Sequence, residues 1–141
     1  MPNWCSNSII IKDLTIEQVA DLERYIAEND GRFFQYFRPR PKKDDDDWYD
    51  WNLKNWGTKW DACDTHISET HKDKIVIMFE SAWAPPTELY YYIHDKGYKF
   101  VAKYSEPMMG FAGIFEDGMD MYWETFMDWE TLESIANKEE N

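Results

Sequence analysis

The chain has 141 residues, enough for one domain with a buried core. Hydrophobic residues make up 43% of it, which excludes a wholly disordered polypeptide. Its 28 acidic and 15 basic residues give a formal net charge of −13, which opposes direct binding to nucleic acid or to an anionic membrane.

The first part of the chain predicts a strand followed by a helix. The β-branched run at residues 8–12 is typical of a strand buried on both faces. Thr15 and Gln18 have the spacing of a capping box, and Gly31 is a suitable helix terminator. The apolar stripe of this helix consists of Ile16, Val19, Leu22 and Ile26.

Residues 32–62 lose regular periodicity and predict a long insertion. Prolines at positions 39 and 41 enforce extended backbone, and the acidic run 44–47 follows them. Residues 48–61 then hold four of the eight tryptophans. Because indole rings are costly to leave in water, these rings fill a core, line a pocket or face a partner. Such a long insertion is more often functional, or a partly helical lid, than a plain connector.

Regular patterns return after the insertion. Residues 63–70 and 74–80 predict a β-hairpin whose second strand is central in its sheet. Pro85 and Pro86 begin a helix that ends at Gly97. Two strands follow, at residues 99–104 and 111–115, and the apolar positions from 129 to 136 indicate a short helix.

This order predicts an α+β protein with a ferredoxin-like split βαβ core, in which two helices cover one face of an antiparallel sheet. The aromatic insertion after the first helix would cover the other face. An extra strand or hairpin and a short helix would complete the C-terminal part. We expect one domain over residues 1–136 and a frayed tail over residues 137–141.

Five phrases, in the same order, resemble the YubB ferredoxin-like family, a domain of unknown function found in phages, plasmids and bacteria. They are residues 1–7, Trp48-Tyr49 with Trp51, residues 55–62, residues 82–86, and residues 104–107 with 110–113. The resemblance spans most of the chain and implies the ferredoxin-like fold and an origin on a mobile element. It supplies no catalytic residues, since the family brings no established activity. The acidic run 44–47 and the tail beyond Gly118 look particular to this member.

The tryptophans predict an aromatic cleft with a few directed polar groups, which is the usual composition of a small-molecule pocket. Such rings could stack on a planar, nucleotide-like ligand. The alternative is that the indoles plug the open face of the sheet. The candidate cleft residues are Trp48, Trp51, Asn55, Trp56, Thr58, Lys59, Trp60, Asp61, Trp83 and Glu106, together with Trp4.

The carboxylates predict an acidic face for a partner protein with a basic surface, because they could occupy a groove that normally holds phosphates. The alternative is a solvated surface that keeps the protein soluble. The candidate residues are Asp44, Asp45, Asp46, Asp47, Asp50, Glu116 and Asp117, with further candidates at Asp120, Glu124, Asp128, Glu130 and Glu133.

Two functional hypotheses follow. The first is a non-catalytic binding protein of a phage or other mobile element that acts on a host protein, in its most specific form as an inhibitor of a host defence system. The second is a small-ligand module that uses the tryptophan cleft. No motif supports an enzyme, and we expect no catalytic residues, no cofactor and no metal: His66 and His71 flank the hairpin turn without a recurring ligand spacing.

The chain lacks a signal peptide and an apolar run of membrane-spanning length, so the sequence predicts a cytoplasmic protein with Cys5 and Cys63 reduced. If a phage encodes it, the cytoplasm is that of the host cell. An open sheet edge could pair two copies of the chain as a homodimer.

Overall fold

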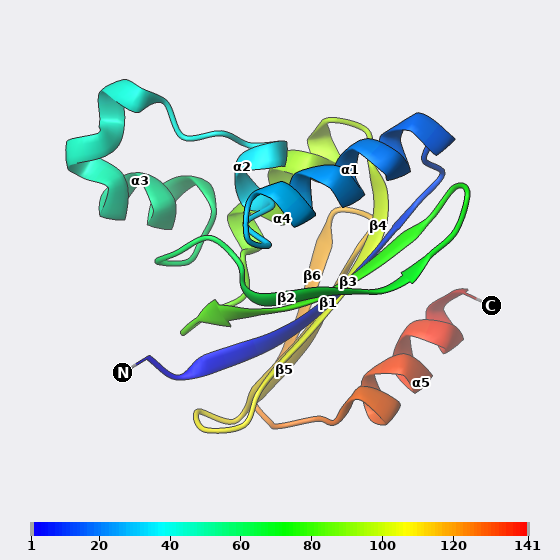
Figure 1. Cartoon of the computed structure of the whole chain (residues 1–141). Coiled ribbons are helices and arrows are strands. Elements are labelled where there is room, and N and C mark those ends of the chain that lie inside the picture. The colour runs from blue at the N-terminus through cyan, green and yellow to red at the C-terminus, as the bar shows by residue number, and fades with distance from the viewer. Residues whose placement is uncertain (1, 141) are drawn as a thin grey trace.

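The protein is an α+β fold built on a six-stranded, antiparallel open sheet (Figure 1). A computed structural model describes residues 2–140, without the side chains of residues 43–45 and 137–140. The strand order is β2-β3-β1-β4-β5-β6. The strands are β1 (Trp4–Lys12), β2 (Cys63–Thr70), β3 (Ile75–Ala82), β4 (Lys99–Glu106), β5 (Phe111–Glu116) and β6 (Met119–Trp123). The helices are α1 (Ile16–Glu28), α2 (Phe34–Phe37), α3 (Trp48–Asn55), α4 (Thr87–Asp95) and α5 (Trp129–Glu140), with a 3-10 turn η1 (Lys42–Asp47).

Helix α1 begins with the capping box that the sequence predicts. The Thr15 hydroxyl accepts a hydrogen bond from the Gln18 backbone N–H (3.1 Å), and the Gln18 side chain accepts one from the Thr15 N–H (2.8 Å). Three predicted stripe residues, Val19, Leu22 and Ile26, are buried. Ile16 is 64% exposed, so its place in the stripe was wrong: it occupies the first helical position, and the three later residues make the contact with the sheet.

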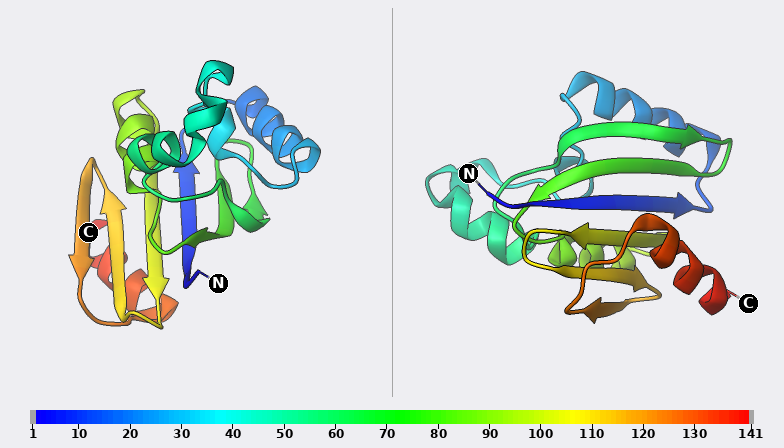
Figure 2. Two further views of the ribbon diagram at one scale, coloured as in Figure 1. Left: turned by 90° about the vertical axis from the view of Figure 1, so that its left-hand side faces the viewer. Right: turned by 90° about the horizontal axis from the view of Figure 1, so that it is seen from below.

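Helices cover both faces of the sheet (Figures 1 and 2). On one face α1, α2 and α4 enclose the larger core, in which Leu22, Phe34 and Leu89 pack over Ile9 and Ile77. On the other face α5 lies over a smaller core of Val101, Ala112, Ile114, Leu132 and Ala136. Each face therefore buries its own apolar residues against helices.

The insertion does not cover the face of the sheet that was predicted for it. Phe33, Phe34 and Trp56 belong to the same core as α1 and α4, and the opposite face is covered by α5. The insertion is partly helical, since it contains α2, η1 and α3. Its helical part projects beyond the end of the sheet where β1 begins (Figure 1).

The hairpin β2–β3 and the interior position of β3 agree with the prediction. The extra C-terminal element is a hairpin of β5 and β6 that turns at Asp117 and Gly118. The frayed tail was predicted over residues 137–141, and the structure does not describe the side chains of residues 137–140. The backbone of α5 runs to Glu140. Among the described residues, no helix is both long and apolar enough to cross a membrane.

Candidate binding groove

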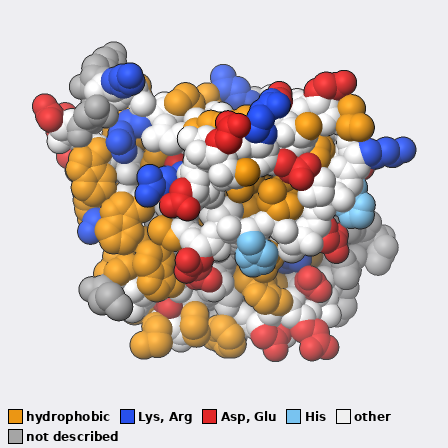
Figure 3. All heavy atoms as spheres, viewed as in Figure 1, with side chains coloured by type: hydrophobic (Ala, Val, Ile, Leu, Met, Phe, Trp, Pro, Cys, Tyr) orange, Lys and Arg blue, Asp and Glu red, His pale blue; other side chains and the backbone are white. Residues whose placement is uncertain are grey.

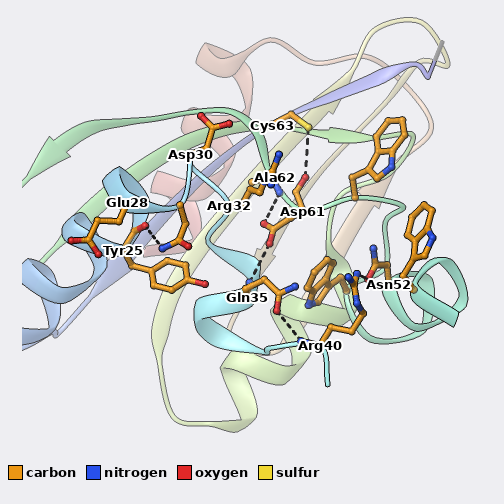
Figure 4. A pocket seen from close by; sticks show the side chains of 14 residues that line it. Tyr25, Glu28, Asp30, Arg32, Gln35, Arg40, Asn52, Asp61, Ala62 and Cys63 are labelled. Atoms are coloured by element: carbon orange, nitrogen blue, oxygen red, sulfur yellow. Dashed lines mark hydrogen bonds between the residues drawn. The ribbon is translucent and has the colours of Figure 1, made fainter. Parts of the chain in front are cut away.

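A groove of about 950 Å³ opens where the insertion meets the C-terminal end of α1 and the start of β2 (Figure 4). The C-terminal turn of α1, the α2 segment, α3 and the chain before β2 all contribute side chains to it. The lining residues are Tyr25, Glu28, Asn29, Asp30, Arg32, Gln35, Arg40, Trp48, Asn52, Trp56, Trp60, Asp61, Ala62 and Cys63.

The Asp61 carboxylate joins two separate segments at the base of the groove. Its Oδ1 accepts hydrogen bonds from the Phe34 N–H (3.0 Å) and the Ala62 N–H (2.7 Å). Its Oδ2 accepts one from the Gln35 N–H (3.2 Å). Burial raises the pKa of Asp61 from 3.8 to about 6, although these three bonds and nearby Arg32 act in the opposite direction. The groove therefore contains a carboxyl group that titrates near neutral pH.

Polar side chains fix the opposite wall. The Arg40 guanidinium donates to Asn52 Oδ1 (3.2 Å), and the Arg40 N–H donates to Gln35 Oε1 (2.8 Å). Asn52, which is almost fully buried, donates from Nδ2 to the Lys59 carbonyl (2.8 Å). These bonds hold α3 to the chain on both sides of it, so the wall is preformed.

The indoles divide between the core and the surface of the groove. Trp56 is 1% exposed, and its Nε1 donates to the Arg38 carbonyl (3.0 Å). Its ring makes edge contacts with Phe34 (5.6 Å) and Trp51 (5.4 Å). Trp48 and Trp60 are partly exposed and line the groove. The burial of Trp56 therefore agrees with the core alternative, while the use of Trp48 and Trp60 as a binding surface stays a prediction.

Trp60 is held in place from outside the groove. The Lys59 ammonium lies 4.5 Å from the centre of its ring, and the Trp4 ring lies 6.1 Å away. Hydrophobic side chains gather on this side of the molecule, below α3 (Figure 3). The exposed ones at this end of the sheet include Trp4, Tyr49, Leu53 and Trp83.

Four of the predicted cleft residues line the groove: Trp48, Trp56, Trp60 and Asp61. The other seven, Trp4 among them, lie outside its lining, and most have structural contacts. Trp51 packs behind Trp56, Asn55 donates to the Trp51 carbonyl (3.0 Å), and Lys59 covers the outer side of Trp60.

Thr58, Trp83 and Glu106 lie farther away. The buried Thr58 hydroxyl donates to the Ala82 carbonyl (2.7 Å) at the end of β3. The buried Glu106 carboxylate accepts from the backbone N–H groups of Met108 (2.8 Å) and Met109 (2.5 Å) in the turn between β4 and β5. Trp83 follows β3 and is half exposed, outside the lining of the groove.

Several lining residues have no counterpart among the predicted ones. Tyr25, Arg32, Gln35, Arg40 and Asn52 come from α1, the α2 segment and α3. The sequence contains one local signal for Asn52 as a groove residue: it stands within a run of aromatic residues, where a buried amide is unusual. The others meet only through tertiary folding, which no local pattern encodes.

The predicted acidic residues do not form one face. Asp46, Asp47 and Asp50 are exposed around the start of α3, in the part of the insertion that projects beyond the end of the sheet (Figure 1). Glu116 and Asp117 lie elsewhere, at the β5–β6 turn near His94 and the C-terminal end of α4. Asp44 and Asp45 lie outside the described side chains.

The further acidic candidates are scattered. Asp120 is partly buried and accepts a hydrogen bond from the Tyr104 hydroxyl (2.7 Å), while Glu124, Asp128, Glu130 and Glu133 lie after β6 or along α5. No three His, Cys, Asp or Glu side chains come together as a metal site within the described part of the chain.

Comparison of the chain with protein-family models, curated proteins and solved structures gives no match. The class of protein is therefore defined by its own structure, as an α+β domain with an open, aromatic and polar groove. Membership of the YubB family stays a prediction.

Proposed function

We propose that this is a ligand-binding protein that receives a planar, nucleotide-like molecule in the groove between α1, α3 and the start of β2. One observation carries the proposal: a groove of about 950 Å³ combines partly exposed Trp48 and Trp60 rings with Asp61 and two arginines. Its volume is in the range of small-molecule sites, which are lined by apolar surface and a few directed polar groups.

The proposed ligand follows from the chemistry of the walls. A flat heterocycle can stack on an indole ring, and this stacking does not require a particular pattern of hydrogen-bond donors and acceptors on the ligand. Asp61 can accept a hydrogen bond from an exocyclic amine, and Arg32 or Arg40 can donate to a carbonyl or phosphate oxygen. We further propose that the underlying core is ferredoxin-like, which is supported by the order β2-β3-β1-β4 and by α1 and α4 on one face.

Tryptophan fluorescence titrated with nucleosides and nucleotides tests the proposal. Trp60→Ala should weaken binding by roughly 5- to 150-fold, which corresponds to the loss of about 1–3 kcal/mol of stacking. Trp83→Ala is the matched control, because Trp83 is also half exposed and lies outside the groove. Equal affinities of both variants for every compound that quenches the wild-type protein would contradict the groove assignment.

A second candidate function is the binding of a basic partner protein, in keeping with the proposed origin on a mobile element and with inhibition of a host defence system. It is favoured by the exposed surface of α3, where Tyr49 (45% exposed) and Leu53 (41%) stand beside Asp50. Asp46→Asn with Asp47→Asn should then weaken partner binding and reduce its salt dependence while leaving the groove titration unchanged.

A further inference from the structure

The two edges of the sheet are built differently. Strand β2 pairs with β3 through two register shifts, between Cys63 and His66 and between Ile67 and Glu69. Such irregularities hinder the pairing of an edge strand with a strand of another chain. Strand β6 pairs with β5 through five consecutive residue pairs without a shift. Figure 2 shows β6 at the outer edge of the sheet, and no described strand lies beyond it.

The residues of β6 add to this difference. Met119 is 65% exposed, Tyr122 is 52% exposed, and Phe126 just after the strand is 51% exposed. The strand contains no lysine or proline, the residues that usually protect an edge. Its only charged side chain, Asp120, is turned toward the Tyr104 hydroxyl (2.7 Å). The edge is therefore regular, apolar and almost uncharged in a protein of net charge −13.

We propose that β6 pairs antiparallel with β6 of a second copy of this chain, which joins the two sheets across a twofold axis at Met121. The proposal goes beyond the ligand-binding function and does not depend on it. Residues directly opposite each other in an antiparallel pair share a face of the sheet. A twofold axis perpendicular to a continuous sheet must therefore pass through a residue pair made of the same residue from each copy.

The side chains select Met121 as that residue. An axis at Asp120 would oppose the two Asp120 carboxylates, and an axis at Tyr122 would oppose Asp120 to Glu124 of the second copy. Like charges directly opposite each other destabilise a strand pair. With the axis at Met121, Asp120 faces Tyr122 and Met119 faces Trp123 of the second copy. This register also pairs all five residues of β6, whereas each of the other two pairs three.

The second copy fits this edge better than a basic partner does. A basic strand would gain little from an edge whose one carboxylate already has a hydrogen-bond donor. Two copies gain apolar contacts from Met119, Tyr122 and Phe126, against the mutual repulsion of two acidic domains. Because salt screens that repulsion, self-association should strengthen with ionic strength, whereas association with a basic partner would weaken.

Sedimentation velocity of the full chain over a concentration series, at low and high salt, tests the pairing. We expect a weak dimer that is favoured by salt. Tyr122→Glu places a carboxylate opposite Asp120 of the second copy at both symmetry-related positions, and Tyr122→Lys does not, so the dimer dissociation constant of Tyr122→Glu should be several-fold higher than that of Tyr122→Lys. Met119→Glu and Met119→Lys form the matched pair, since position 119 faces Trp123; they should differ much less, which controls for net charge.

Crosslinking tests the register. In a Cys63→Ser background, mild oxidation of Met121→Cys should give a covalent dimer, because identical residues face each other at the axis within reach of a disulfide. Met119→Cys should not, because the two copies of position 119 lie apart in this register. The proposal is overturned if the chain stays monomeric at both low and high salt concentration. It is also overturned if β6 pairs only with strands of other proteins. Equal crosslinking of the two cysteine variants, or equal dissociation constants of the two Tyr122 variants, overturns it as well.

Discussion

Titration of Asp61 should make the stability of the protein depend on pH in an unusual direction. Carboxylates in folded proteins are commonly stabilised in their charged form, so that stability rises with pH. Burial raises the pKa of Asp61 to about 6 in the folded state, against 3.8 for the free side chain. Between these two values the folded protein holds a proton that the unfolded chain has lost, so the free energy of unfolding falls as pH rises.

The size of the effect follows from the two pKa values. One pKa unit corresponds to about 1.4 kcal/mol, so the free energy of unfolding should fall by about 3 kcal/mol through Asp61. The contribution is fully present below pH ~4 and is lost above pH ~6. The three backbone N–H bonds to Asp61 work against it, because they favour the carboxylate.

Urea unfolding of the wild type and of Asp61→Asn between pH 4 and pH 7 isolates this contribution, because other titrating groups cancel in the difference. The asparagine oxygen can keep the bonds from Phe34 and Ala62, so the variant should differ by a constant offset and should not titrate at this position. We expect the stability of the wild type relative to the variant to fall over this range. A flat difference, or one that rises with pH, would show that the hydrogen bonds outweigh burial and would refute the reasoning.

Three further substitutions or reactions test the packing. Gly113→Ala would place a Cβ 2.2 Å from the Tyr104 ring and 2.7 Å from the Met121 carbonyl oxygen, so we expect a loss of at least about 2 kcal/mol in urea unfolding. Gly97→Ala should cost less, about 1–2 kcal/mol, because no atom lies within 4 Å and only the positive φ of 95° opposes a side chain. Thr58→Val removes the 2.7 Å hydrogen bond to the Ala82 carbonyl, which keeps the Ala84 N–H (2.8 Å), and should cost about 1 kcal/mol, more than Thr87→Val, whose bond is 3.5 Å. Burial raises the pKa of both thiols, so alkylation followed by mass spectrometry should modify partly exposed Cys63 first and Cys5 only after unfolding; rapid labelling of Cys5 in the native protein would contradict its burial.

Local patterns predicted the elements whose signals are local. The Thr15 capping box, the β2–β3 hairpin and the proline-led start of α4 each depend on residues a few positions apart. The side of the sheet covered by the insertion depends instead on a competition between distant segments. Leu132 and Ala136 of α5 bury one face, which leaves the insertion to pack beside α1.

The candidate site was predicted in part for the same reason. The sequence marks an excess of indoles, and it cannot separate Trp56, which the core buries, from Trp60, which stays at the surface. The polar partners of the groove show the limit more clearly. Arg40 meets Asn52 only because the chain turns back through η1 and α3, so their pairing is a product of the tertiary fold.

The buried part of the insertion explains how the groove can remain open. Phe34 and Trp56 anchor the insertion in the main core, and the Trp56 carbonyl accepts a hydrogen bond from the Leu89 N–H (3.2 Å) of α4. Asp61 then ties the start of α2 to the start of β2. These contacts fix the backbone of the insertion, so Trp48 and Trp60 do not have to pack against each other to be held in place. A ligand would therefore enter a preorganised site at little conformational cost. Because the groove lies toward the β2 side of the sheet and the proposed pairing uses β6 at the other edge, ligand binding and self-association should be independent of each other.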